Sequence, residues 1–153
     1  MATLAPIRVD RKADRMEPPK TLRYAGDVLR VLGECDGLAI GELTVPAGFA
    51  GPPPHVHHDF DEALYLLSGQ LTMVRGRDEP VPVEAGGLIL APRGVRHTFA
   101  NPGAEPARVL GIWTPGAALG FMADIGAALP ASGPPDRALL AAIYLRHRSE
   151  IVP

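Results

Sequence analysis

Short apolar runs separated by glycine and proline dominate the chain from Thr21 to Trp113. The segments near 21–32 and 37–45 are rich in Val, Leu and Ile, which are residue types that favour strands. Glycine and proline punctuate these runs and the later ones, as expected where strands end in tight turns. The pattern predicts at least eight short strands, packed as an all-β sandwich or barrel.

The spacing of apolar positions changes after Pro115, where they recur three and four residues apart among alanines. This helical period predicts two short helices, over 116–129 and 134–150. Asp136 and the two prolines before it suit the start of the second helix. Neither helix has enough apolar length to be stable alone, so we expect both to pack on the barrel. Three side chains are candidates for an apolar lid over the barrel mouth: Phe121, Met122 and Ile125.

The length of 153 residues predicts a single domain. Hydrophobic residues make up 46% of the chain and charged residues 21%, so it can bury a core of ordinary size. Residues 1–20 mix charges with prolines and show neither period, which predicts an N-terminal arm. The barrel is expected over 21–115, followed by the C-terminal helices over 116–153.

The formal net charge of −2 provides no basic surface, so we expect neither a nucleic-acid nor a membrane partner. No apolar stretch forms a signal peptide or reaches the roughly 18 residues of a membrane span, and a cytoplasmic location is expected. Cys35 is the only cysteine, which excludes an intramolecular disulfide. We expect its side chain to act as a small buried or half-buried hydrophobe.

Two histidines one residue apart, His55 and His57, begin the candidate site. Alternate side chains of a strand share a face, so both imidazoles should point to the same side. Glu62 follows at an odd offset that would turn it away on a continuous strand. The polar segment 57–61 can supply a turn, so we expect Glu62 to begin the neighbouring antiparallel strand. His97 follows a Pro-Arg-Gly turn signal that delivers a further strand.

Three imidazoles and one carboxylate form a donor set that suits Fe, Ni, Mn, Co or Cu, and also Zn. Mg and Ca are disfavoured because they prefer oxygen ligands throughout. An octahedral ion with four protein ligands would keep two open positions, whereas a tetrahedral zinc would be nearly saturated. A His-x-His pair alone is equally compatible with histidines of a surface turn, so the spacing of the other residues decides the question.

That spacing resembles the two motifs of the cupin superfamily. The first motif has a glycine-led loop, H-x-H, Glu and Gly, and here these are Gly51, His55, His57, Glu62 and Gly69. The second has Gly, P-x-G, His and Asn, and here these are Gly86, Pro92, Gly94, His97 and Asn101, which match every interval. The one departure is Gly51, which leaves three residues before H-x-H where the family commonly has five. This difference concerns the loop and leaves the ligands untouched.

The cupin resemblance implies a single jelly-roll β-barrel that binds one divalent transition metal. Its ligands would be His55, His57, Glu62 and His97. Gly69, Gly86 and Gly94 would occupy turns that need a positive φ. We expect Asn101 to tie a turn through its side-chain amide rather than to contact substrate.

A narrower resemblance, over about two thirds of the chain, is to small single-domain quercetin dioxygenase-like cupins. It implies a dioxygenase that oxidises or cleaves a small hydroxylated aromatic or enol substrate, with Glu62 as a catalytic base. The alternative enzyme is a non-redox, metal-dependent cyclase or isomerase of polyketide type, in which the metal is a Lewis acid. A third hypothesis is a small-ligand-binding cupin without turnover. The expected partners are a small-molecule substrate, dioxygen in the first case, and a second copy of the chain in a homodimer.

Several other residues attract attention by their chemistry. Strand alternation should turn His58 and Tyr65 away from the ligands, toward the surface. His147 is expected to be a solvated cation at the end of the last helix. Core packing, rather than a place in a cavity wall, is expected for Trp113, Phe99 and Met73.

Overall fold

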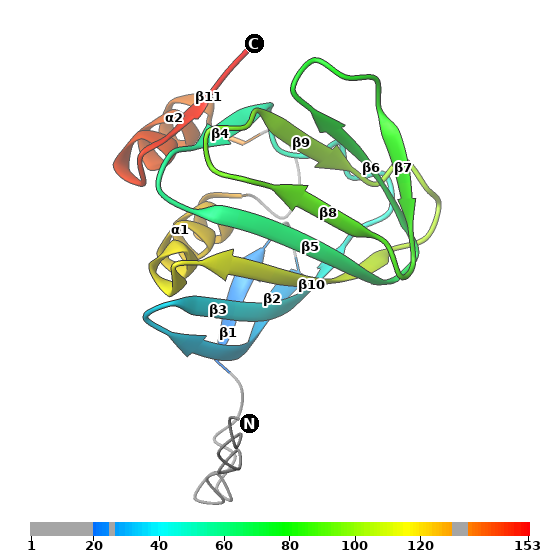
Figure 1. Ribbon diagram of the computed structural model, residues 1–153, viewed down its shortest axis with the longest axis horizontal. Helices are drawn as coiled ribbons and strands as arrows, with labels where there is room; N and C mark the ends of the chain where they lie inside the picture. Colours follow the sequence, from blue (N-terminus) through cyan, green and yellow to red (C-terminus); the bar gives the residue numbers. More distant parts are fainter. Residues whose placement is uncertain (1–19, 25–26, 130–134) are drawn as a thin grey trace, which may run out of the picture.

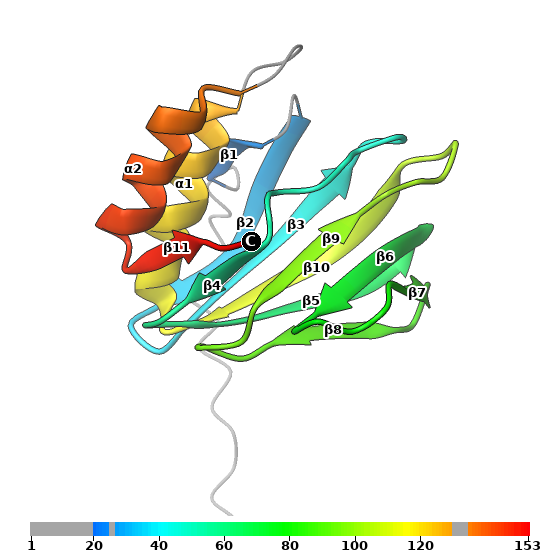
Figure 2. The ribbon, with the colours of Figure 1, turned by 90° about the horizontal axis from the view of Figure 1, so that it is seen from above.

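The computed structural model describes residues 20–24, 27–129 and 135–153, which form two antiparallel sheets and two helices (Figure 1). The six-stranded sheet has the order β1 (Thr21–Tyr24), β2 (Asp27–Cys35), β3 (Leu38–Val45), β10 (Ala107–Thr114), β5 (Asp61–Ser68) and β8 (Leu88–Ala91). The five-stranded sheet has the order β11 (Ser149–Ile151), β4 (His55–His57), β9 (His97–Ala100), β6 (Gln70–Arg75) and β7 (Val81–Glu84). Both sheets contribute side chains to one core, and Figure 2 shows the arrangement of their strands from above. The prediction of an all-β jelly roll with two C-terminal helices is confirmed.

Alternating burial along β3 and β10 turns one face of each strand into the core. Val109 and Trp113 of β10 are both fully buried there. Gly111 lies between them, and a Cβ at this position would come 2.2 Å from the Trp113 ring. The Trp113 indole therefore packs over Gly111 of the same strand, in space that any larger side chain at position 111 would fill.

Glu62 lies on β5, which pairs with β10 and β8 rather than with β4. The prediction that Glu62 begins the antiparallel neighbour of the His55–His57 strand is therefore wrong. The chain crosses between the sheets after His57, so β4 and β5 lie in different sheets. The physical reason is that β9 and the C-terminal strand β11 already occupy both edges of β4.

After β10 the chain forms a 3₁₀ turn η2 (Gly116–Ala118), then α1 (Leu119–Ala128), α2 (Arg137–Arg146) and β11. The Asp136 carboxylate caps α2 by accepting hydrogen bonds from the first backbone N–H groups of the helix. The predicted extension of this helix to residue 150 is wrong. Arg148 adopts a positive φ of 48°, and Ser149–Ile151 pair with β4 instead. Both helices lie at one end of the barrel, where α1 packs on β1 and α2 on β11 (Figures 1 and 2).

The predicted N-terminal arm lies outside the described residues except for Lys20. The division of the chain at residues 20 and 115 stays a prediction. Within the described ranges, every helix is too short or too polar to cross a membrane.

Cys35 is exposed, so the prediction of a buried or half-buried side chain is wrong. It ends β2 opposite Leu38, at the hairpin that leads into β3. The last four residues of β2 are all exposed. At such a hairpin tip the second sheet does not cover the strand, so the apolar character of a residue does not lead to burial.

Asn101 ties the chain between β9 and β10, as predicted. Its side chain is buried, and Nδ2 donates hydrogen bonds to the carbonyl oxygens of Val45, at 3.1 Å, and Glu105, at 2.9 Å. Its Oδ1 accepts a hydrogen bond from the backbone N–H of Gly103, at 3.0 Å. One buried amide therefore joins the β9–β10 loop to the end of β3.

Replacement of Asn101 by Ala is expected to lower the free energy of unfolding by roughly 2 to 4 kcal/mol, because buried backbone groups lose their partners. Urea unfolding followed by circular dichroism measures this loss. Thr72→Ala is the control, since Thr72 is half-buried on β6 and its side chain has no hydrogen bond among the described residues. Equal losses in the two variants would contradict the role of Asn101.

Candidate metal centre

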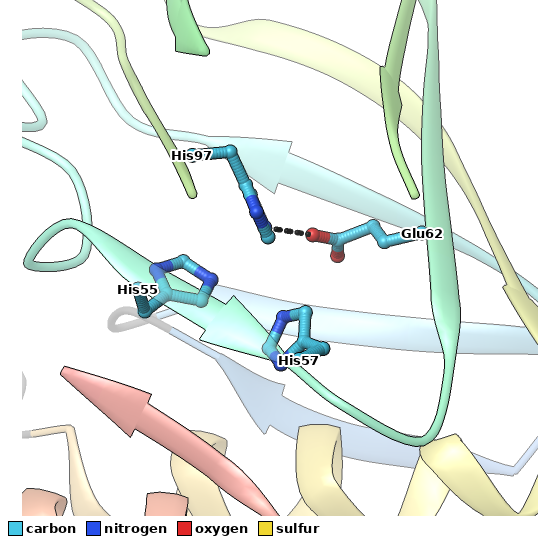
Figure 3. Close-up of side chains that lie close together, drawn as sticks. All are labelled: His55, His57, Glu62 and His97. Atoms are coloured by element: carbon cyan, nitrogen blue, oxygen red, sulfur yellow. Dashed lines mark ion pairs between the residues drawn. The ribbon is translucent and has the colours of Figure 1, made fainter. Parts of the chain in front are cut away.

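The structure brings together the four residues that the sequence predicts as metal ligands (Figure 3). His55 and His57 lie on β4, His97 pairs with His55 from β9, and Glu62 reaches the same point from β5 in the other sheet. One ligand atom from each residue lies within 4.8 Å of the other three. All four side chains are buried. The group could hold a metal ion.

Carbonyl oxygens fix the tautomers of His55 and His97. His55 Nδ1 lies 2.8 Å from the Pro53 carbonyl oxygen, and His97 Nδ1 lies 2.9 Å from that of Val95. A carbonyl oxygen only accepts, so both Nδ1 atoms carry hydrogen. In each neutral ring, Nε2 is therefore left with the lone pair that can bind a metal.

A serine from the C-terminal strand does the same for His57. Ser149 Oγ lies 2.8 Å from His57 Nδ1 and donates its own hydrogen to the His147 carbonyl oxygen, at 3.2 Å. It must therefore accept the hydrogen of Nδ1. No sequence pattern points to Ser149, because a serine at an apparent helix end carries no sign of a bond to a residue 92 positions away.

The Nε2 atom of His97 has no hydrogen-bond partner among the described residues, although it is fully buried. It lies 3.4 Å from Glu62 Oε2, an ion-pair distance that Figure 3 marks, without hydrogen-bond geometry. A buried polar atom without a partner costs about 1 to 3 kcal/mol. A cation bound among the four side chains would supply the missing partner, so the donor set fits a metal ion.

At three of the four side chains, His55, His57 and Glu62, the electrostatics favour the protonation states that metal binding needs. Burial lowers the pKa of His55 to about 4 and that of His57 to about 3, so both rings are neutral at neutral pH. Burial raises the pKa of Glu62, but the surrounding histidines outweigh this effect and hold it at about 2. Burial also lowers the pKa of His97, and the Glu62 carboxylate outweighs it, so that pKa is raised. An ionised carboxylate among imidazoles is the ligand set of a metal site.

Trp113 is packed in the core as predicted, and it also contacts the candidate centre. Its Nε1 donates a hydrogen bond of 2.8 Å to Glu62 Oε1, from the position opposite Glu62 in the β10–β5 register. This bond leaves Oε2 as the carboxylate atom that faces His97. The type of the side chain predicted that Trp113 packs in the core, whereas its hydrogen-bond partner depends on strand register.

A cavity of about 330 Å³ opens beside the four side chains. This volume is within the range of small-molecule sites. His55, His57 and Glu62 line it, and most of the remaining wall is apolar. The side chains predicted as an apolar lid form part of that wall: Phe121, Met122 and Ile125. Phe99, expected only in the core, also lines the cavity.

Two tyrosines that the sequence analysis did not single out, Tyr24 and Tyr144, also line this cavity. Tyr24 ends β1 and Tyr144 lies on α2, near opposite ends of the chain. Burial raises the pKa of both phenols above the usual value, so both hydroxyls keep their hydrogen. Only the tertiary fold brings them together.

His58 and Tyr65 face the surface, as predicted, and His58 Nε2 lies 3.3 Å from Glu150 Oε1. The prediction for His147 is wrong in part. It does end α2, but its side chain is only 23% exposed, and its Nε2 lies 2.8 Å from Asp124 Oδ2. Packing of α1 against α2 supplies this carboxylate.

Trp113→Phe is expected to lower the free energy of unfolding of the metal-free protein by roughly 2 to 4 kcal/mol. The buried Glu62 carboxylate loses a donor, and the smaller ring leaves a void. Urea unfolding in the presence of a chelator measures the effect. A double-mutant cycle with Glu62→Ala should give a coupling free energy of about 1 kcal/mol or more. Additive losses would show that the indole acts through packing alone.

Comparison with known proteins finds a family model that matches the part of the chain containing the four side chains. Residues 41–113 match the family model described as Cupin domain. A 56-residue segment is 41% identical to the tetracenomycin polyketide synthase protein TcmJ of Streptomyces glaucescens. The aligned segment covers 37% of this chain and 37% of that relative.

Two solved structures share the fold. One is an uncharacterized protein with a double-stranded β-helix domain from Klebsiella pneumoniae, at 23% identity and a TM-score of 0.52, over 60% of this chain and 79% of that chain. The other is a cupin-superfamily sugar phosphate isomerase from Silicibacter pomeroyi, at 23% identity and a TM-score of 0.53, over 67% of this chain and 73% of that chain. Together, the matched segment, the two sheets and these solved structures show that residues 41–113 have a cupin fold.

Proposed function

We propose that the chain is a metal-dependent enzyme in which His55, His57, Glu62 and His97 hold one divalent transition metal. The unpartnered Nε2 of His97, buried beside the Glu62 carboxylate, is the observation that carries this proposal. Three imidazoles with hydrogen on Nδ1 and one ionised carboxylate suit Fe, Ni, Mn, Co, Cu and Zn.

The substrate in this proposal is a hydroxylated aromatic or an enol. The cavity wall is mostly apolar, and the described residues that line it include neither Lys nor Arg. Such a wall offers no positive side chain to a phosphate or carboxylate group. The partial likeness to a polyketide synthase protein supports the same class, because polyketide chains carry ketones that enolise.

The reaction that these observations favour is a non-redox cyclisation or isomerisation of polyketide type. When bound, the metal would act as a Lewis acid toward a substrate oxygen. Glu62 is the proposed base: Trp113 occupies its Oε1, so Oε2 would be both the metal-ligating atom and, on release from the metal, the atom that accepts a proton from the substrate. The apolar wall around the cavity limits the access of water to the reacting group.

A dioxygenase of quercetinase type is the second candidate. The same nitrogen-rich donor set suits redox-active iron, nickel and manganese, and an apolar cavity of this size accepts a hydroxylated aromatic. A small-ligand-binding cupin without turnover is the remaining alternative.

Metal content tests the proposed centre directly. His97→Ala is expected to lose most bound metal after purification, because it removes one of four ligands. His58→Ala is the matched control, since His58 is exposed and follows the ligand His57 in sequence. Elemental analysis of both variants gives the metal-to-protein ratio. Equal ratios in His97→Ala and the unaltered chain would contradict the proposed ligand set.

A need for oxygen distinguishes the dioxygenase from the non-redox cyclase or isomerase. With a metal-loaded sample, cyclised products of a triketone such as 1-phenylhexane-1,3,5-trione should form equally fast under argon and in air. Glu62→Gln is expected to keep part of the metal and to lower this rate at least about 100-fold, the range of general base catalysis. Full activity in Glu62→Gln would show that Glu62 is not the base.

Oxygen uptake with a panel of flavonols and catechols would support the dioxygenase instead. Tight ligand binding without product or oxygen uptake would support the binding module. Homodimer formation and a cytoplasmic location stay predictions from the sequence.

A further inference from the structure

Tyr24 and Tyr144 lie far apart in the sequence, and both line the cavity beside the candidate metal centre. Tyr24 is the last residue of β1 and is 5% exposed, and Tyr144 lies in α2 and is 2% exposed. Both line the cavity that His55, His57 and Glu62 also line. Each is therefore more than nine-tenths buried and borders the same enclosed space.

Neither phenol hydroxyl has a hydrogen-bond partner among the described residues. The one fully enclosed side-chain atom without a partner in these residues is His97 Nε2. The two hydroxyl oxygens are therefore not fully enclosed, and the cavity is the open space that both side chains line. A buried tyrosine hydroxyl ordinarily finds a partner, because an unmade bond costs about 1 to 3 kcal/mol. Among the described residues no group fills this role, and a ligand in the cavity can supply it.

The surroundings hold both rings in place. The Tyr144 ring meets the rings of His55 and Phe121 edge to face, with centroids 5.2 Å and 5.1 Å away. Tyr24 follows Arg23, whose carbonyl oxygen packs so closely on Gly126 of α1 that a Cβ there would come within 1.6 Å. This contact fixes the end of β1 against α1. The donors are thus positioned before a ligand arrives, which lowers the entropy cost of binding.

The chemistry of the cavity indicates what the ligand carries at this point. The Nδ1 hydrogens of His55 and His57 are already bonded, to Pro53 and Ser149, and Glu62 only accepts. Among the described side chains that line the cavity, the two phenols are therefore the neutral donors without a bonded partner. They suit an acceptor oxygen, and the apolar remainder of the wall suits fused rings.

We propose that the hydroxyls of Tyr24 and Tyr144 donate hydrogen bonds to a ketone or enolate oxygen of a neutral, multi-ring aromatic ketone bound in this cavity. The assignment deepens the proposed function and rests on it for the orientation of the ligand toward the four-residue centre. Donors aimed at such an oxygen stabilise the negative charge that develops when the adjacent carbon loses a proton. Tyr24 and Tyr144 thereby select oxygenated substrates over plain hydrocarbons of the same shape.

Binding of a bicyclic aryl ketone to the metal-free protein tests this donor pair. The probe is 1-tetralone, whose carbonyl can only accept, and the matched hydrocarbon is tetralin. Tyr24→Phe and Tyr144→Phe are each expected to weaken 1-tetralone binding roughly two- to tenfold in calorimetric titrations, the effect of one net hydrogen bond. The double variant should lose more than either single variant. Tetralin affinity should change less than twofold, because phenylalanine keeps the ring.

Tyr65→Phe is the matched control, since Tyr65 is exposed on the outside of β5. Infrared spectra of bound 1-tetralone give a second readout: its carbonyl stretch should rise in frequency in each cavity variant and stay unchanged in the control. Wild-type affinity in the double variant, equal losses for ketone and hydrocarbon, or no binding of 1-tetralone by the wild-type chain would overturn the proposal. These titrations contain no metal, so a failure of the proposed metal function leaves their outcome unaffected.

Discussion

Hydrogen bonds from the Nδ1 atoms of three buried imidazoles are the interactions on which the candidate centre depends. Each bond holds a ring in one tautomer and leaves Nε2 free. The acceptors come from the loop before β4, the turn before β9 and the C-terminal strand. Burial makes this arrangement strict, because a ring that turned away would leave polar atoms without partners in an apolar core. The Glu62 carboxylate, held by Trp113, completes the group from the opposite sheet.

Residues on both sides of the segment that matches the Cupin domain model also contribute to the candidate site and its cavity. The family model covers residues 41–113, which contain all four candidate ligands. Tyr24, Tyr144 and Ser149 lie outside this segment, yet two of them line the cavity and the third orients His57. The matched segment therefore carries the candidate centre, whereas the terminal elements shape the space in which a ligand would lie.

The cavity is lined mostly by apolar side chains, and the described residues in its wall include neither Lys nor Arg. Apolar side chains from α1 and α2 surround the polar end instead. Both helices lie beside β1 and β11 in Figure 2, and side chains from each line the cavity next to the candidate centre.

The sequence by itself determined the strand-rich fold, the four candidate ligands and the structural role of Asn101. These follow from local rules, since alternation, turn residues and motif spacing act over a few positions. Only the tertiary structure decided that Glu62 comes from the opposite sheet, that Cys35 is exposed and that His147 pairs with Asp124. It also decided the strand after α2, and with it the bond between Ser149 and His57. The physical reason is that these contacts join residues distant in sequence, and no local pattern encodes which strand takes a free edge.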